Sequence, residues 1–284
     1  MTAHEALLDR HYSDRQLIVV TEDKLAEYTD EVQNVENTKK KDGVDWRRLA
    51  ETAVLDAVPI PFTRLAAEVT REAIRAWARA NESGVRVLPV GRKESVSLRF
   101  PPGHPRDGIV YVGHPSLPNV YFPMADFHRI MFEQKFCESL ELLMALGATE
   151  ISVQCVKGWG REFSSLISAP LGGSAASVEA EAKGQKTKKV EMLYKATLSG
   201  TDAPMAPDDL IWFQHEPTWQ TIAKGRMKFG LKDFTLSVTY EDDFGVNGSL
   251  KTSLSKAGLN LGGSFHEHQA TVWQISGTFG NGSP

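Results

Sequence analysis

The sequence contains little cysteine, which limits the chemistry and the compartment that suit it. Only Cys137 and Cys155 occur among the 284 residues, one in a helical pattern and one in a strand pattern. Their spacing matches neither a disulfide framework nor a CxxC metal clip. A reducing, cytoplasmic setting is therefore expected.

Long apolar runs are also lacking. No stretch approaches the roughly 18 uninterrupted apolar residues that a membrane-spanning helix needs. Residues 1–20 are acidic and polar, without a basic segment followed by an apolar one, so no secretory signal is predicted. Any passage through a bilayer would have to use β-strands, which need only about 9–11 alternating residues.

Neither an excess of positive charge nor a catalytic motif is present. The 36 acidic and 32 basic residues give a net charge of −4, so a nucleic-acid partner is not expected. The GxSxG, HExxH and kinase signatures do not occur. The glycine pairs near residues 158–160 and 171–174 lack the Lys-Ser/Thr of a phosphate-binding loop. The sequence names no catalytic residue and implies no cofactor.

The first half of the chain has helical periodicity. Residues 1–43 are rich in charge and weakly periodic, so we expect a mobile or loosely docked leader, followed by a single domain over residues 44–284. Helical spacing recurs from Leu65 to Ala78. The alternation between Val85 and Phe100 predicts a hairpin that turns around Gly91.

The strongest helical pattern covers residues 125–146, with Gly147 placed as its C-cap. Strand alternation dominates after it, and it extends through Leu250 and Leu254. The predicted fold is α+β, with a helix-rich N-terminal half packed on a largely antiparallel, twisted β-sheet with long hairpins. The clearest predicted strands are residues 149–156, 190–198, 233–240 and 271–279.

Histidines are the weak candidates for chemistry. His266 and His268 are two residues apart, so on a strand they would share a face and could hold one transition metal. A third ligand is missing nearby, and a surface pair near a turn is the alternative. His104, His114 and His128 could instead belong to an enzyme whose catalytic groups come together in space.

Two regions suggest contact with a membrane. Both combine alternating strands with polar, Gly/Ser-rich turns, as amphipathic transmembrane hairpins do. A neighbouring basic cluster could bind anionic lipid headgroups, although a solvated loop is the alternative. The membrane-facing candidates are Val178, Ala180, Ala182, Leu250, Leu254, Leu259, Leu261 and Phe265, and the headgroup candidates are Lys183, Lys186, Lys188 and Lys189.

From Val85 to Phe279 the layout, a helical layer beside a sheet with two extendable hairpin regions, resembles gasdermin-like pore-forming proteins, with no diagnostic residue motif matched. The resemblance implies a cytoplasmic protein that inserts amphipathic hairpins into an anionic membrane after a trigger and assembles as a homo-oligomer. One alternative is a non-catalytic protein-binding or self-assembly module, with Trp212, Trp219 and Trp273 as core or interface anchors. The other is an enzyme with a dispersed His/Asp site.

Overall fold

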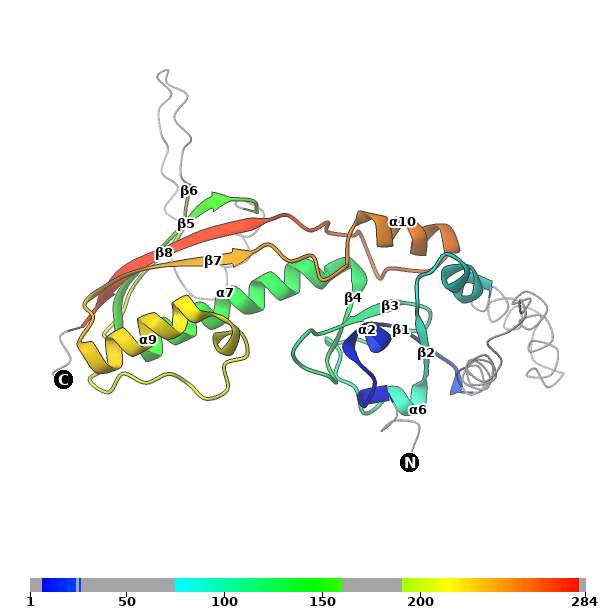
Figure 1. Cartoon of the computed structure of the whole chain (residues 1–284), viewed down its shortest axis with the longest axis horizontal. Helices are drawn as coiled ribbons and strands as arrows, with labels where there is room; N and C mark the ends of the chain where they lie inside the picture. Colours follow the sequence, from blue (N-terminus) through cyan, green and yellow to red (C-terminus); the bar gives the residue numbers. More distant parts are fainter. Residues whose placement is uncertain (1–6, 24–25, 27–74, 160–190, 281–284) are drawn as a thin grey trace, which may run out of the picture. The chain divides into compact units, whose positions relative to one another are not determined.

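The computed structural model of the chain describes residues 7–23, 26, 75–159 and 191–280. It has an α+β fold with two four-stranded sheets, one mixed and one antiparallel. The chain divides into two compact units, each described by itself below (Figure 1). Unit 1 comprises Met1–Ile130 and Asp243–His268, and unit 2 comprises Met131–Asp242 and Gln269–Pro284.

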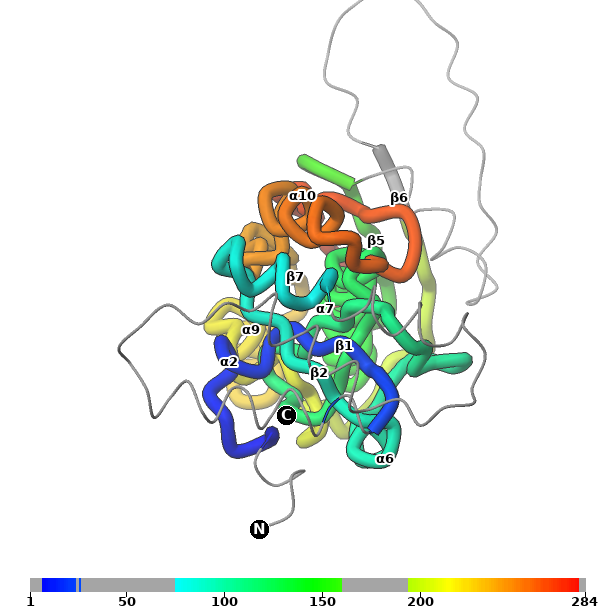
Figure 2. The backbone as a smooth tube through the Cα atoms, turned by 90° about the vertical axis from the view of Figure 1, so that its right-hand side faces the viewer, coloured from blue at the N-terminus to red at the C-terminus, as the bar shows by residue number. Residues whose placement is uncertain are grey.

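Unit 1 is built on the mixed sheet, whose strand order is β2 (Leu88–Gly91), β1 (Leu17–Thr21), β3 (Val110–Gly113) and β4 (Tyr121–Pro123). Strand β1 pairs in parallel with β2, beside which it lies in Figure 2, and antiparallel with β3. All residues of β2, β3 and β4 are buried. Short apolar strands of this kind are typical of a sheet covered on both faces.

The N-terminal half therefore contains a four-stranded mixed sheet, whereas the prediction was a helix-rich half with one hairpin. Strand β1 falls within residues 1–43, the segment expected to be a leader, and its residues Leu17–Val20 are buried. Residues 75–82 are helical, in line with the end of the predicted helix. Earlier residues of that predicted helix lie outside the described part of the chain.

The predicted hairpin around Gly91 is wrong. Strand β2 is followed by a short helix, α6 (Arg92–Ser95), and Val96 is 84% exposed. The reason is that β2 pairs with β1, a strand that lies far earlier in the chain. Local alternation shows that a segment suits a strand, but it does not show which strand will be its partner.

Unit 2 is built on the antiparallel sheet, in the order β6 (Glu191–Thr197), β5 (Ala148–Lys157), β8 (Thr271–Phe279) and β7 (Asp233–Tyr240). All three strand pairs are antiparallel. These strands coincide with the four predicted from alternation, which confirms that part of the prediction. Strand β7 shows why: its side chains alternate strictly between buried and more exposed positions.

Helix α7 (Phe127–Ala145) runs along one face of this sheet in Figure 1 and supplies much of its core. The rings of Phe132 and Phe136 each lie 4.7 Å from the Trp273 ring, measured between centroids. Gly147, at a φ of 87°, follows the helix, as predicted for its C-cap. No helix in the described residues is long and apolar enough to cross a bilayer.

Helix α9 (Pro217–Phe229), preceded by the turn η2 (Phe213–His215), completes unit 2. Trp212, Trp219 and Trp273 are all buried, as expected for core side chains. The Glu138 carboxylate on α7 accepts hydrogen bonds from the backbone amides of Ile211 and Phe213, at 2.8 and 2.7 Å. Burial raises the pKa of Glu138, and these amide donors act in the opposite direction.

Candidate functional site

The residues that join β7 to β8 form the candidate site. We call residues 241–270 the β7–β8 connector, and the structure describes all of them. The connector contains one helix, α10 (Gly248–Ala257), with irregular backbone on both sides. Residues 243–268 belong to unit 1, whereas β7 and β8 belong to unit 2. Contacts within unit 1 therefore determine how the connector folds.

Helix α10 corrects the prediction that Leu250 and Leu254 lie on a strand. The Asn247 side chain accepts hydrogen bonds from the amides of Ser249 and Leu250, both at 3.1 Å, and so caps the helix. Gly258 ends it in the left-handed region, at a φ of 90°. Residues four apart share a face in a helix and also in a strand, so the leucine spacing alone could not distinguish the two.

Hydrogen bonds tie the connector to the rest of unit 1 along much of its length. Most of them use backbone groups, which a side-chain substitution in the connector would leave in place. They also satisfy donors and acceptors that irregular backbone would otherwise leave unpaired. Named donor first, they are Val110 N to Asn260 O (2.8 Å), Ala125 N to Leu261 O (2.9 Å), His266 N to Ala125 O (3.0 Å), Arg79 Nε to Ala257 O (2.9 Å) and Gln16 Nε2 to Phe244 O (2.6 Å).

The predicted membrane-facing residues of the connector are covered to different extents. Leu254, Leu259 and Leu261 are buried, and Leu254 is fully inaccessible. Leu250 and Phe265 are half-buried. The other predicted residues lie outside the described part of the chain: Val178, Ala180, Ala182, Lys183, Lys186, Lys188 and Lys189.

The apolar alternation of β7 and β8 continues into the connector. Strand β7 buries its even-numbered residues, and near its start β8 buries odd-numbered ones. The two strands pair one to one from Asp233 with Thr278 to Tyr240 with Thr271, without a register shift. In the connector, the larger apolar residues continue this numbering. After β7 they stand at even positions, and before β8 they stand at odd positions. They are Phe244, Val246, Leu250 and Leu254, and then Leu259, Leu261 and Phe265.

A buried histidine on α7 contacts the connector within unit 1. His128 is fully buried, and its Nε2 donates a hydrogen bond to the Val246 carbonyl. Its ring centroid lies 5.2 Å from that of His268 and 6.4 Å from that of Phe265. Burial lowers the pKa of His128, and His268 lowers it further, while the Val246 bond and Asp243 oppose this. A neutral His128 therefore suits the folded connector.

The structure also places the two histidines predicted as metal ligands. Residues 261–270 form no strand, so the expected shared strand face is wrong: backbone bonds hold this segment to unit 1 instead of to a sheet. His266 is exposed, and His268 faces His128. Among the residues that the structure describes, no group of three or more His, Cys, Asp and Glu side chains could hold a metal ion.

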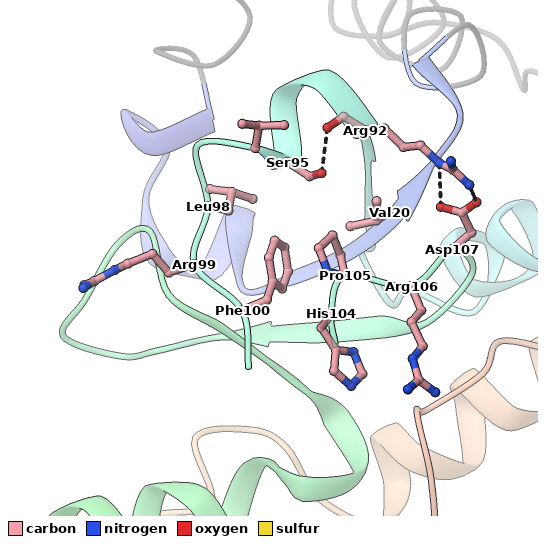
Figure 3. Close-up of a pocket in the computed structure, with 11 residues that line it drawn as sticks. Val20, Arg92, Ser95, Leu98, Arg99, Phe100, His104, Pro105, Arg106 and Asp107 are labelled. Carbon is pink, nitrogen blue, oxygen red and sulfur yellow. Dashed lines mark hydrogen bonds and ion pairs between the residues drawn. The ribbon is translucent and has the colours of Figure 1, made fainter. Parts of the chain in front are cut away.

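A pocket of about 750 Å³ lies on unit 1 around His104. Figure 3 shows its apolar part around Phe100 and Pro105, with the Arg92 side chain turned toward Asp107. Arg92 forms an ion pair with Asp107, and Arg106 Nε donates to the Gly103 carbonyl at 3.2 Å. The lining residues are Val20, Arg92, Ser95, Val96, Leu98, Arg99, Phe100, His104, Pro105, Arg106 and Asp107.

Polar groups at this pocket form hydrogen bonds with one another or with the backbone of unit 1. The Tyr111 hydroxyl accepts a bond from the Arg106 amide at 2.7 Å, so its own proton can go to His104 Nδ1, also at 2.7 Å. Burial lowers the pKa of His104, as does Arg106, which favours a neutral ring. Ser95, the hydroxyl residue of this lining, donates to the Arg92 carbonyl at 2.8 Å and not to a histidine.

The three histidines of the enzyme alternative have different structural partners. His104 contacts Tyr111, His128 contacts Val246, and His114 Nδ1 accepts bonds from the amides of Ser116 and Leu117, both at 3.0 Å. His114 thus stabilises a turn. Sequence reasoning placed His128 in the enzyme alternative, and only the structure joined it to the connector.

The β7–β8 connector combines residues that were predicted to face a membrane with tertiary contacts to the rest of unit 1. It carries predicted membrane-facing leucines, a helix with defined caps and a set of hydrogen bonds to unit 1. Comparison with known proteins gives no match for this chain, whether to a family model, a curated protein or a solved structure.

Proposed function

We propose that this chain forms membrane pores, by releasing the β7–β8 connector from unit 1 and adding it to β7 and β8 as one long hairpin. The observation that supports this proposal is the unshifted β7–β8 register, together with the alternation of apolar residues that continues from both strands through the connector. The proposed partners are an anionic membrane and further copies of this chain.

Continuing the β7–β8 register places the larger apolar residues from Phe244 to Phe265 on one face of a hairpin, with Asp242, Glu267 and Gln269 on that face only at its base. It would pair Val246 with Phe265, Leu250 with Leu261, and Thr252 with Leu259. Ser249, Lys251 and Ser253 would lie on the opposite, polar face. The arms, residues 241–255 and 256–270, exceed the roughly 9–11 residues that a transmembrane strand needs.

The energetics explain why the connector would stay docked away from a membrane. Exposing Leu254, Leu259 and Leu261 to water costs about 1.5–3 kcal/mol for each side chain. Burying the same side chains in lipid avoids that cost. The backbone hydrogen bonds to unit 1 would be replaced by the ladder of the hairpin and by pairing with the hairpins of neighbouring copies, and closure of these strands into a barrel would satisfy every backbone group within the bilayer.

The sheet of unit 2 offers a route to the proposed homo-oligomer. Strands β6 and β7 are its edges in the described structure. An edge strand presents unpaired backbone groups that another strand can join. Pairing β6 of one copy with β7 of the next would be a head-to-tail contact, which can close into a ring. The second proposed hairpin, between β5 and β6, lies largely outside the described residues.

The first test is release of a trapped dye from vesicles. The full chain is added to phosphatidylcholine vesicles with and without phosphatidylglycerol, from about pH 5 to pH 7.5, before and after limited proteolysis. We expect release from the anionic vesicles in at least one of these conditions. Absence of release in all of them would overturn the proposal.

A pair of lysine substitutions tests the hairpin register. Thr252 and Ser249 are both exposed on α10, so Thr252→Lys and Ser249→Lys should leave the folded protein intact. In the extended hairpin Thr252 lies on the lipid face and Ser249 on the polar face. On a barrel's lipid face a lysine costs about 2–4 kcal/mol at the bilayer midplane and less towards the interfaces, and Thr252 would lie three residues from the turn. Thr252→Lys should therefore reduce dye release while Ser249→Lys keeps it, and equal activity of the two variants would contradict the register.

A disulfide tests whether the connector must leave unit 1. A Cβ placed on Gly263 would lie 3.5 Å from the Ala125 Cβ, within the range of disulfides. Gly263→Cys with Ala125→Cys, made with Cys137→Ser and Cys155→Ser, should block release when oxidised. Reducing the same protein should restore release, which controls for strain at Gly263. Release from the oxidised form would show that the connector acts in place.

A non-membrane assembly module would give different results. It would form a discrete oligomer without lipid, and it would release no dye. Sedimentation across a range of protein concentrations distinguishes the two, because the proposed pore former should assemble on vesicles.

A further inference from the structure

The C-terminal end of α9 exposes large apolar side chains between lysines. Phe229 is 75% exposed and Met227 is 43% exposed. Lys224, Lys228 and Lys232 flank them and are also exposed. We call residues 224–232 the α9 tip. Single exposed apolar residues are common on protein surfaces, but two that alternate with three cations form a mixed surface that the folding of unit 2 does not require.

The α9 tip is held firmly on unit 2. Arg226 is buried and donates hydrogen bonds to the carbonyls of Leu146 (3.1 Å), Leu231 (3.2 Å) and Gly280 (2.8 Å). Its guanidinium also lies 5.0 Å from the centroid of the Phe279 ring. Because Arg226 is fixed from several sides, its neighbours Met227 and Phe229 are presented outward in a defined position.

The lysines of the α9 tip are available for an external partner. Within the described part of the chain, none of the three ammonium groups forms an ion pair with a carboxylate. The adjacent acidic residue is Asp233, the exposed first residue of β7. The tip therefore carries an excess of positive charge close in the chain to two exposed apolar side chains.

We infer that the α9 tip is a docking surface for anionic lipid, with Phe229 and Met227 entering the membrane interface and the three lysines above the headgroups. Charge complementarity supports lipid as the occupant, because cations that alternate with apolar side chains match an interface where anionic headgroups lie over hydrocarbon. This inference rests on the proposed membrane action but concerns a different element from the connector. It also differs from the basic cluster predicted at residues 183–189.

The expected effects follow from the chemistry of this surface. Each lysine near an anionic membrane strengthens binding roughly fivefold, so three together contribute on the order of 100-fold. Removing the apolar side chains should weaken binding by a further tenfold or more. Both contributions should be present in the full chain before any hairpin is inserted.

The test is co-sedimentation of the full chain with vesicles of phosphatidylcholine alone or with phosphatidylglycerol, at about 0.1 M salt. Lys224→Gln/Lys228→Gln/Lys232→Gln and Met227→Ser/Phe229→Ser should each lose most of the binding to anionic vesicles. The charge-matched control replaces exposed lysines outside both the α9 tip and the connector, Lys93→Gln/Lys157→Gln/Lys195→Gln, and should bind like the unaltered protein. Circular dichroism checks that every variant is folded.

Each outcome distinguishes this inference from the proposed pore. If binding to vesicles depends on the α9 tip but no dye is released, the inference about the tip is supported and the pore proposal is wrong. If dye is released and the tip variants bind vesicles as well as the unaltered protein does, the inference about the tip is wrong and the pore proposal is supported. If the tip variants lose self-association in sedimentation without lipid, and bind vesicles normally, the tip is a protein contact and the inference is wrong.

Discussion

The β7–β8 strand pair and the connector that joins it carry the same alternation of apolar residues, yet they fold differently. In the strand pair, Trp273 faces the aromatic side chains of α7 and is completely buried. In the connector, Leu254 is equally buried but belongs to a helix. Asn247 and Gly258 supply the caps of that helix. Alternation thus determines which side chains seek burial, whereas caps and partners determine the backbone that buries them.

The connector is the proposed mobile element because its sequence suits both a helix and a strand. A sequence that suits two structures can change from one to the other when its partner changes. In the docked state the partner is unit 1. In the proposed inserted state it is lipid on one side and the β7–β8 ladder on the other.

The largest expected effect lies in the strand pair. Trp273→Ala removes a side chain packed against Phe132 and Phe136 and should lower the free energy of unfolding by about 3–5 kcal/mol. Thr235→Ala, on the exposed face of β7, should change it by no more than about 0.5 kcal/mol. Urea denaturation measures both. Similar values for the two variants would contradict the assigned core face.

A smaller effect is expected in the connector. Leu254→Ala should cost about 2–4 kcal/mol, because this leucine is fully buried in unit 1. Hydrogen exchange followed by mass spectrometry should show faster exchange over residues 246–262, with β8 changed much less. Equal acceleration in β8 would mean that the connector does not open separately, which would remove the physical basis of the proposed release.

The N-terminal cap of α10 should contribute less to the free energy of unfolding than Leu254 does. Asn247→Ala removes the acceptor for two amides and should destabilise the helix by about 1 kcal/mol. Asn247→Ser keeps a capping oxygen and should recover most of that loss. Urea denaturation and exchange at residues 248–257 check both variants. An Ala variant as stable as the Ser variant would show that tertiary contacts alone hold α10.

The smallest expected effect is that of pH on the docked connector. The pKa of His128 is lowered in the folded protein, mainly by burial, so its neutral form is favoured there. Folding stability should therefore be complete above the ordinary histidine value near 6.5 and should fall as the pH drops below it. His268 and Asp243 are the titratable groups that act on His128.

The unfolding midpoint in urea, measured at about pH 7.5 and pH 5.5, tests this dependence. His128→Gln can still donate to the Val246 carbonyl but does not titrate, so its midpoint should change less between the two pH values. An unchanged pH dependence in this variant would assign the effect to other groups.

Much of unit 2 could be predicted from the sequence. Strands β5 to β8 are each seven residues or longer and alternate, most strictly in β7, and the helical pattern of α7 stops just before Gly147. Unit 1 was harder to predict because its strands are short and uniformly buried, and because β2 pairs with β1 across a long interval of chain. The tip of α9 was missed because exposure is not visible in a sequence.

The sequence by itself determined which residues avoid water, since apolar alternation and helical periodicity follow directly from residue identity. It predicted Leu250 and Leu254 on one face of a strand, whereas they lie on α10, whose caps Asn247 and Gly258 are local. The tertiary structure alone decided that β1 completes a sheet with β2 and that His128 meets the connector. The physical reason is that backbone hydrogen bonds and buried contacts need partners, and those partners lie far apart in the chain.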